Sequence, residues 1–119
     1  MGFEAHIDRI EKTLTKFGGL YEFSDIIDCI EDGEMQMFAE GDSIAITKVA
    51  DFPRKRVLDI VLAYGNMDEL LKLQHRVYDY AKEVGAEMIM AANSRQGWAA
   101  QMLDGDGWKM VGVVYIKEL

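Results

Sequence analysis

The sequence predicts one domain of the α+β class over residues 1–119, an α/β arrangement with a mixed sheet. Hydrophobic residues first recur at spacings of three and four, as on the faces of helices, and from Glu34 onward they alternate, as in half-buried strands. A strand, a long helix and a second strand then follow one another, which is typical of a βαβ unit with parallel neighbouring strands. The predicted order is helix, helix, strand, strand, strand, helix, strand, helix, strand.

Composition and charge narrow the classes of function. Half of the residues are hydrophobic, which suffices for a core without disulfides or metal. The net charge of −8 argues against nucleic acid or an anionic membrane surface as a partner. The single Cys29 lies in an apolar stretch, which favours a buried small residue over a nucleophile. The first residues lack the pattern of a signal peptide, so we expect a protein of the cytoplasm.

Two helices are predicted first. The apolar face of the first is formed by residues spaced three and four apart, namely Phe3, Ile7, Ile10, Leu14 and Phe17. Gly18 and Gly19 are expected to end this helix. A second, shorter helix is predicted over 23–30, with Ser24 or Asp25 near its start and Gly33 as its stop.

The next segments predict a sheet. Residues 34–38 alternate between polar and apolar, and a second strand containing Ile44, Ile46 and Val49 follows the turn at Gly41 and Asp42, so the two form an antiparallel hairpin. Residues 57–64 are almost continuously apolar, as expected of a central strand covered on both faces.

The second half of the chain supplies the βαβ unit. Asn66 and Glu69 have the spacing of a capping box, and the helix that they begin runs to Val84. A buried strand over 87–92 follows, then a short helix over 96–103 and a last strand over 109–116.

This order resembles the GCN5-related N-acetyltransferase (acyl-CoA N-acyltransferase) fold. Members often carry an Asn at the end of the strand after the long helix and a Gly–aromatic pair before a later strand; here these are Asn93 and Gly107-Trp108. The family's first strand has no counterpart in this sequence. Three stretches are similar, more particularly, to small phage and prophage proteins of acetyltransferase-like fold whose genes lie among virion genes. They are Gly33–Gln36, Pro53–Leu58 and Arg95–Trp98.

The resemblance implies a place for acetyl-CoA. Its pyrophosphate would bind at the start of the long helix, where glycines and backbone N–H groups approach the phosphates. The cofactor-binding candidates there are Tyr64, Gly65, Asn66 and Met67. This loop holds one glycine and no Arg or Lys, and Asp68 and Glu69 follow it in the first helical turn. Each carboxylate stabilises the helix by about 0.3–1 kcal/mol and would repel a pyrophosphate, which favours a self-capped helix over a cofactor site.

The catalytic groups that the resemblance implies are incomplete. The family's usual general acid, a Tyr four residues before the Gly–aromatic pair, falls on Leu103, so Tyr115 is left as a candidate. Asp59 interrupts an apolar strand and is a candidate base, although the pattern favours a structural carboxylate paired with a cation. Its partners would then be Arg54, Arg56 or Lys48. Two histidines and one cysteine show no metal-ligand spacing, so we expect no metal site.

Two functions follow as expectations. The first is a non-catalytic phage or prophage protein that acts in virion assembly or as an internal virion component, without a cofactor. Its partners would be other virion proteins or further copies of itself, in the host cytoplasm and in the virion. The alternative is an acetyl-CoA-dependent N-acetyltransferase with a divergent cofactor loop. Arg95 and Trp98 are candidates for a docking surface, because Arg and aromatic residues are enriched at interfaces. For Trp98 the favoured alternative is a core residue that closes the open end of the sheet.

Overall fold

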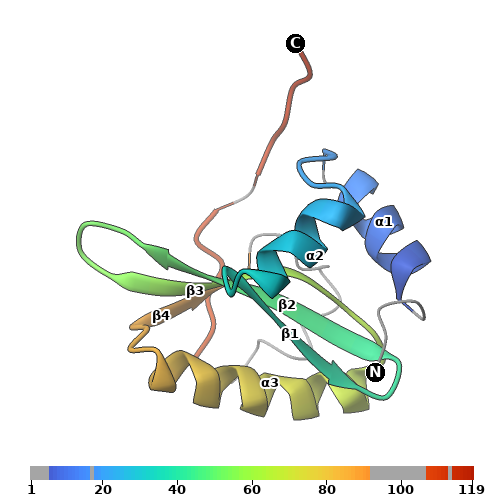
Figure 1. Ribbon diagram of the computed structural model, residues 1–119. Coiled ribbons are helices and arrows are strands. Elements are labelled where there is room, and N and C mark those ends of the chain that lie inside the picture. Colours follow the sequence, from blue (N-terminus) through green and yellow to red (C-terminus); the bar gives the residue numbers. More distant parts are fainter. Residues whose placement is uncertain (1–5, 17, 92–106, 113) are drawn as a thin grey trace.

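The computed structural model describes residues 6–16, 18–91, 107–112 and 114–119 (Figure 1). Within them the chain forms a small mixed α+β domain. Its elements are α1 (Ile7–Lys16), α2 (Phe23–Glu31), β1 (Met35–Glu40), β2 (Ser43–Asp51), β3 (Arg56–Tyr64), α3 (Met67–Glu83) and β4 (Met88–Met90). No helix in this described part is both long and apolar enough to cross a membrane.

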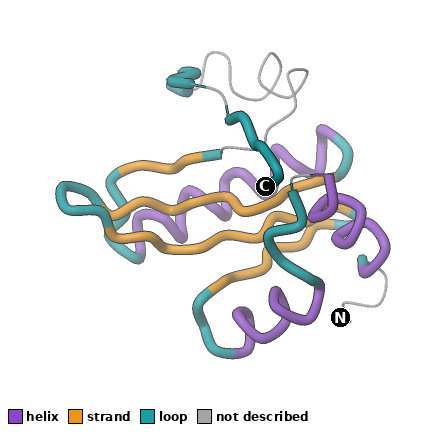
Figure 2. The backbone as a smooth tube through the Cα atoms, turned by 90° about the horizontal axis from the view of Figure 1, so that it is seen from above, coloured by secondary structure: helices purple, strands orange, loops and turns teal. Residues whose placement is uncertain are grey.

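The four strands form one mixed sheet in the order β1-β2-β3-β4 (Figure 2). The pairs β1–β2 and β2–β3 are antiparallel, and β3 and β4 are parallel. The predicted hairpin and the predicted parallel βαβ unit are therefore confirmed. Gly41 begins the two-residue hairpin turn with a φ of 57°, a conformation that glycine adopts readily.

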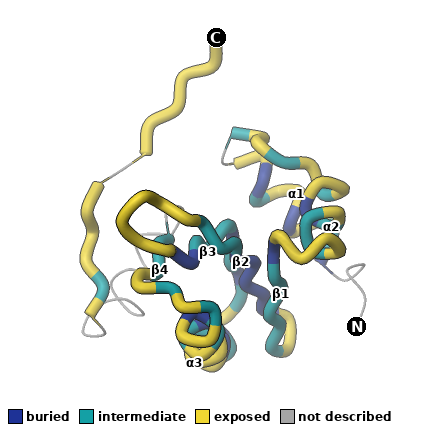
Figure 3. Tube along the Cα trace, turned by 60° about the vertical axis from the view of Figure 1, so that its left-hand side comes forward, coloured by how far each residue is buried: buried dark blue, intermediate teal, exposed yellow. Residues whose placement is uncertain are grey.

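Helices cover both faces of the sheet. Figure 1 shows α1 and α2 on one face and α3 on the other. The first interface is filled by Ile10, Leu14, Ile26, Met35, Ile44, Ile46, Leu62 and Tyr64. The second is filled by Ala45, Leu58, Leu70, Leu73, Val77 and Ala81. The sheet is thus the middle of three layers, and it is most deeply buried along β2 and β3 (Figure 3).

A β-bulge interrupts the alternation of β3, a strand that is apolar at nearly every position because helices cover both faces of the sheet. Ile46 pairs with Leu62 and Thr47 pairs with Ile60, so Val61 is an extra residue opposite β2. Leu62 packs toward α1 and α2, whereas Ile60 packs toward α3, although the two are only two residues apart. Because of the bulge, the residues that alternate toward α3 before Val61 are followed by a series that alternates toward α1 and α2 after it. Both layers contain apolar side chains.

The last predicted strand, 109–116, is wrong. Residues 108–112 and 114–119 form no strand, and Met110, Val111 and Tyr115 are 84–89% exposed. The composition has high strand propensity, but propensity produces a strand only where a neighbouring edge supplies hydrogen bonds. The predicted helix over 96–103 lies outside the described residues.

The helix boundaries also refine the predictions. Helix α1 begins at Ile7 and ends at Lys16, and Gly18 and Gly19 then take positive φ values of 96° and 63°. Phe3 and Phe17 of the predicted apolar face are outside the described residues. Ser24 and Asp25 lie near the start of α2, as predicted; the N-cap itself is Glu22, and the Asp25 carboxylate accepts a hydrogen bond from the Glu22 N–H at 2.8 Å.

Candidate functional site

The four predicted cofactor-binding residues lie together where β3 turns into α3. Tyr64 ends β3, Gly65 makes the turn, Asn66 is the N-cap and Met67 is the first helical residue. The Asn66 side-chain oxygen accepts a hydrogen bond from the Glu69 N–H at 2.9 Å, so the predicted cap is confirmed. One of the N–H groups that would face an anion at this helix end is therefore already bonded.

Ser43, at the start of β2, completes this junction. Its hydroxyl donates to Glu69 Oε1 at 2.7 Å and accepts from the Asn66 N–H at 3.1 Å. The Asn66 side-chain amide donates to the same Glu69 oxygen, also at 2.7 Å. In a capping box the Glu side chain would bond the N-cap N–H directly; here the fully buried Ser43 takes that place. The sequence did not single out Ser43, because nothing local links it to residues 66 and 69.

Two glycines bring these groups into contact. A Cβ added at Gly65 would lie 1.8 Å from Ser43 Oγ, and one added at Gly41 would lie 1.7 Å from Glu69 Oε2. Gly65 also has a φ of 142°, which side chains rarely adopt. The hairpin turn, the β3–α3 turn and the first turn of α3 are therefore packed against one another at this junction. The Glu69 carboxylate occupies the space beside Gly41.

The electrostatics of the junction are negative. Asp68 and Glu69 lie in the first turn of α3, where carboxylates interact favourably with the helix dipole. A phosphate approaching the same N-terminus would meet both of them. The arrangement can thus stabilise the start of α3 from within the chain, at a helix N-terminus, which is in general a position where anions bind.

A buried contact at Tyr64 was not predicted. His6 Nδ1 lies 2.5 Å from the Tyr64 hydroxyl, and the Arg9 guanidinium stacks 4.0 Å from the centre of the Tyr64 ring. Burial raises the pKa of Tyr64 to about 12, while Arg9 opposes the shift. The phenol therefore stays neutral and holds the start of α1 to the end of β3. The sequence gives no signal for this contact, since the two residues are 58 positions apart.

Asp59, the candidate base, is half-buried in β3 opposite Lys48 of β2. Burial raises the pKa of its carboxyl, and the charge of Lys48 opposes this shift. No hydrogen bond or ion pair joins the Asp59 carboxylate to another residue of the described ranges. The expected pairing with Arg56 is wrong, because Arg56 bonds Asp51 at 2.6 Å.

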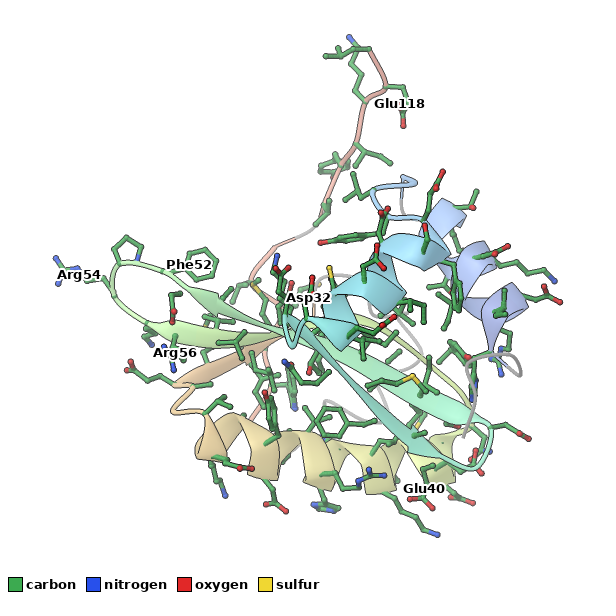
Figure 4. All side chains as sticks on the ribbon, viewed as in Figure 1. Asp32, Glu40, Phe52, Arg54, Arg56 and Glu118 are labelled. Carbon is green, nitrogen blue, oxygen red and sulfur yellow. The ribbon has the colours of Figure 1, made fainter. Side chains whose placement is uncertain are left out.

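The hairpin between β2 and β3 separates the other expected partner from Asp59. Arg54 lies at the exposed tip of that hairpin and points away from the domain, as Figure 4 shows. Arg56 sits at its base, where it also donates to the carbonyl of Val84 at 2.9 Å. Of the three cations considered as partners, only Lys48 acts on Asp59, and it does so as a charge across the strand pair.

The remaining candidates are not assembled into a site. Tyr115 is 89% exposed in the C-terminal segment, and no described residue positions its hydroxyl near Asp59. Arg95 and Trp98 lie outside the described residues. The structure thus brings together the four candidates at the β3–α3 turn, and it does not bring together the two catalytic candidates.

The close approach at Gly65 gives a stability prediction. We expect Gly65→Ala to lower the free energy of unfolding by about 3 kcal/mol, because the new Cβ would be strained and would meet Ser43. Gly33→Ala is the matched control: it has a φ of 81° but open space around its Cβ, and should cost about 1 kcal/mol. Urea denaturation of both variants measures the difference, and equal losses would contradict the packing described.

The two aspartates of the sheet predict opposite effects of removing charge. The pKa of Asp59 is raised from its ordinary value of 3.8, so its ionisation destabilises the fold as pH rises. Asp59→Asn should therefore increase the free energy of unfolding at neutral pH. This gain should vanish in acid, at a pH below the pKa that the Asp59 carboxyl has in the unfolded chain. The hydrogen bond from Arg56 lowers the pKa of Asp51, so Asp51→Asn should lose stability at neutral pH instead. The midpoints of denaturation of both variants, measured across pH, test the predicted gain and the predicted loss. A change of the same sign in both variants would refute the opposite electrostatic environments assigned to Asp59 and Asp51.

Comparisons with known proteins show the fold alone. No protein-family model and no curated protein matches the chain. Two solved structures are similar, and both are of the protein TTHA1254 from Thermus thermophilus. A point mutant of that protein superposes with a TM-score of 0.62 and its wild type with a TM-score of 0.60, each at 14% sequence identity. Each match covers 92% of this chain and 89% of the other. The mixed α+β arrangement of sheet and helices is thus shared with a protein of very different sequence.

Proposed function

We propose that this domain has an acyl-CoA N-acyltransferase-like fold without acyl transfer, and that it acts in phage virion assembly or as an internal virion component. The three-strand meander followed by a parallel βαβ unit supports the fold. The similarity of Gly33–Gln36, Pro53–Leu58 and Arg95–Trp98 to small phage proteins supports the setting. Because one fold serves many functions, only the chemistry of the site speaks against catalysis.

The observation that carries the proposal is the occupied start of α3. Acyltransferases of the resembled family bind the CoA pyrophosphate there through backbone N–H groups and glycines. Here Asn66 caps the helix, and the Glu69 carboxylate lies against Gly41 and accepts from Ser43. A pyrophosphate would have to displace that carboxylate and approach Asp68, at a cost in repulsion between like charges.

Acetyl-CoA binding tests this proposal. We expect isothermal titration of the full chain to show no saturable binding at micromolar acetyl-CoA. A dissociation constant below about 10 µM would instead support the alternative, an N-acetyltransferase with a divergent cofactor loop.

Charge variants show whether the first turn of α3 is responsible. If weak binding is detected, Asp68→Asn combined with Glu69→Gln should tighten it, and more so at low salt, where screening is weaker. Asp79→Asn combined with Glu83→Gln removes two exposed carboxylates from the same helix far from its N-terminus and serves as the control. Equal effects of the two changes would show that only net charge matters.

A further inference from the structure

The hairpin between β2 and β3 ends in an exposed group of basic and apolar side chains. Four residues form this group, which we call the basic tip: Phe52, Pro53, Arg54 and Lys55. All four are exposed, and Phe52 is 53% exposed although its side chain is large and apolar. Arg and aromatic side chains are enriched where proteins dock, and loops on a rigid scaffold often carry such contacts.

The basic tip projects beyond the rest of the sheet. The β1–β2 ladder ends at the pair Met35–Lys48, and the β3–β4 ladder ends at the pair Val57–Met88. Pro53 lies five residues past Lys48, which is about 16 Å at the usual rise of a strand. Figures 1 and 2 show this end of the hairpin beyond the other elements. A partner can therefore reach the tip without displacing a described helix or strand.

Hydrogen bonds fix the hairpin behind its tip. The Phe52 N–H donates to the Lys55 carbonyl at 2.9 Å, which closes the loop. Arg56 donates to the two carboxylate oxygens of Asp51, at 2.6 and 3.3 Å, and to the Val84 carbonyl at 2.9 Å. The loop is thus closed and anchored before a partner arrives, which reduces the conformational entropy that binding has to overcome.

These bonds also divide the three basic residues of the hairpin. The charge of Arg56 is paired with that of Asp51. Arg54 and Lys55 form no ion pair with any residue that the structure describes. The basic tip therefore presents two cationic side chains to a partner, in a chain whose net charge is −8.

Distance limits how far the acidic domain weakens this local positive charge. Glu34 directly precedes β1, and Glu87, whose N–H donates to the Arg56 carbonyl, directly precedes β4, so both lie toward the base of the hairpin. The tip stands about 16 Å beyond the β1 ladder, whereas exposed charges are screened over about 8 Å at physiological ionic strength. A short anionic group at the tip is consequently attracted by Arg54 and Lys55 more than it is repelled by the domain.

The size of the basic tip indicates the class of partner. Nucleic acids bind proteins through many phosphates, and a duplex carries one charge for about every 1.7 Å of its axis. A duplex across two cations would continue over the acidic domain and be repelled there. A short acidic segment of a protein offers a few carboxylates only, and it can add an apolar side chain for Phe52.

We propose that the basic tip docks onto a short acidic segment of a partner protein. Arg54 and Lys55 bind carboxylates of that segment, and Phe52 packs against an apolar side chain within it. The inference rests on the hairpin and its charges alone, so it stands or falls separately from acetyl-CoA binding.

A synthetic peptide tests this docking. A short rhodamine-labelled peptide of alternating Glu and Leu is titrated with the full chain at about 50 mM salt and followed by fluorescence anisotropy. We expect saturable binding with a dissociation constant on the order of 100 µM. The same peptide with Gln in place of Glu should bind at least about tenfold more weakly. Absence of saturable binding up to about 1 mM chain, or equal binding of the two peptides, would overturn the proposal.

Paired variants locate the binding surface. Arg54→Gln combined with Lys55→Gln should weaken binding of the Glu peptide by about tenfold, with an unchanged far-ultraviolet spectrum because both side chains are exposed. Lys12→Gln combined with Lys16→Gln removes the same charge from exposed positions of α1 and should change the affinity by less than about twofold. Phe52→Ala should weaken binding at low and at high salt alike, because its contact is apolar. Equal losses in the two double variants would overturn the assignment to the basic tip.

A rhodamine-labelled single-stranded oligonucleotide tests the class of partner. We expect it to bind more weakly than the Glu peptide at the same salt concentration, because its phosphates extend beyond two cations. If it bound more tightly and lost this binding on Arg54→Gln with Lys55→Gln, the partner would be a nucleic acid and the proposal would be overturned.

Discussion

The hydroxyl of Ser43 is the contact on which the arrangement of sheet and long helix depends. It lies fully buried at the start of β2 and joins the Asn66 N–H to the Glu69 carboxylate. The bond requires the two backbones to approach more closely than any side chain at position 65 would allow. The β1–β2 hairpin, the end of β3 and the start of α3 consequently meet at one junction, and the contact of His6 with Tyr64 joins the start of α1 to it.

This junction also determines what the domain can bind. A helix N-terminus at the end of a strand is a general anion site because its N–H groups are unpaired. Here the Asn66 side chain accepts a hydrogen bond from one of these N–H groups, and the carboxylates of Asp68 and Glu69 lie in the same first turn. The start of α3 therefore has the backbone geometry of a general anion site, while the carboxylates beside it oppose a phosphate.

Local patterns were sufficient for most of the fold. The hairpin, the central strand and the capped helix followed from alternation, an apolar run and the Asn66–Glu69 spacing, because each depends on neighbours in sequence. The bonds of Ser43 to residues 66 and 69, and of His6 to Tyr64, join distant segments and leave no periodic signal. The predicted strand over 109–116 failed for the opposite reason: its composition was suitable, but strand formation depends on an edge that composition does not reveal.

The bulge at Val61 has a consequence for how the sequence of β3 can vary. Apolar residues of similar size can replace one another at the apolar positions of this strand, because apolar clusters pack against both of its faces. The number of residues in β3 is more tightly constrained than their identity, because the extra residue at the bulge sets which side chains face each layer. Loss of the extra residue would restore simple alternation, and every side chain on one side of it would exchange the α3 layer for the α1–α2 layer. Evolution of this strand should accordingly tolerate changes of identity and select strongly against insertions and deletions.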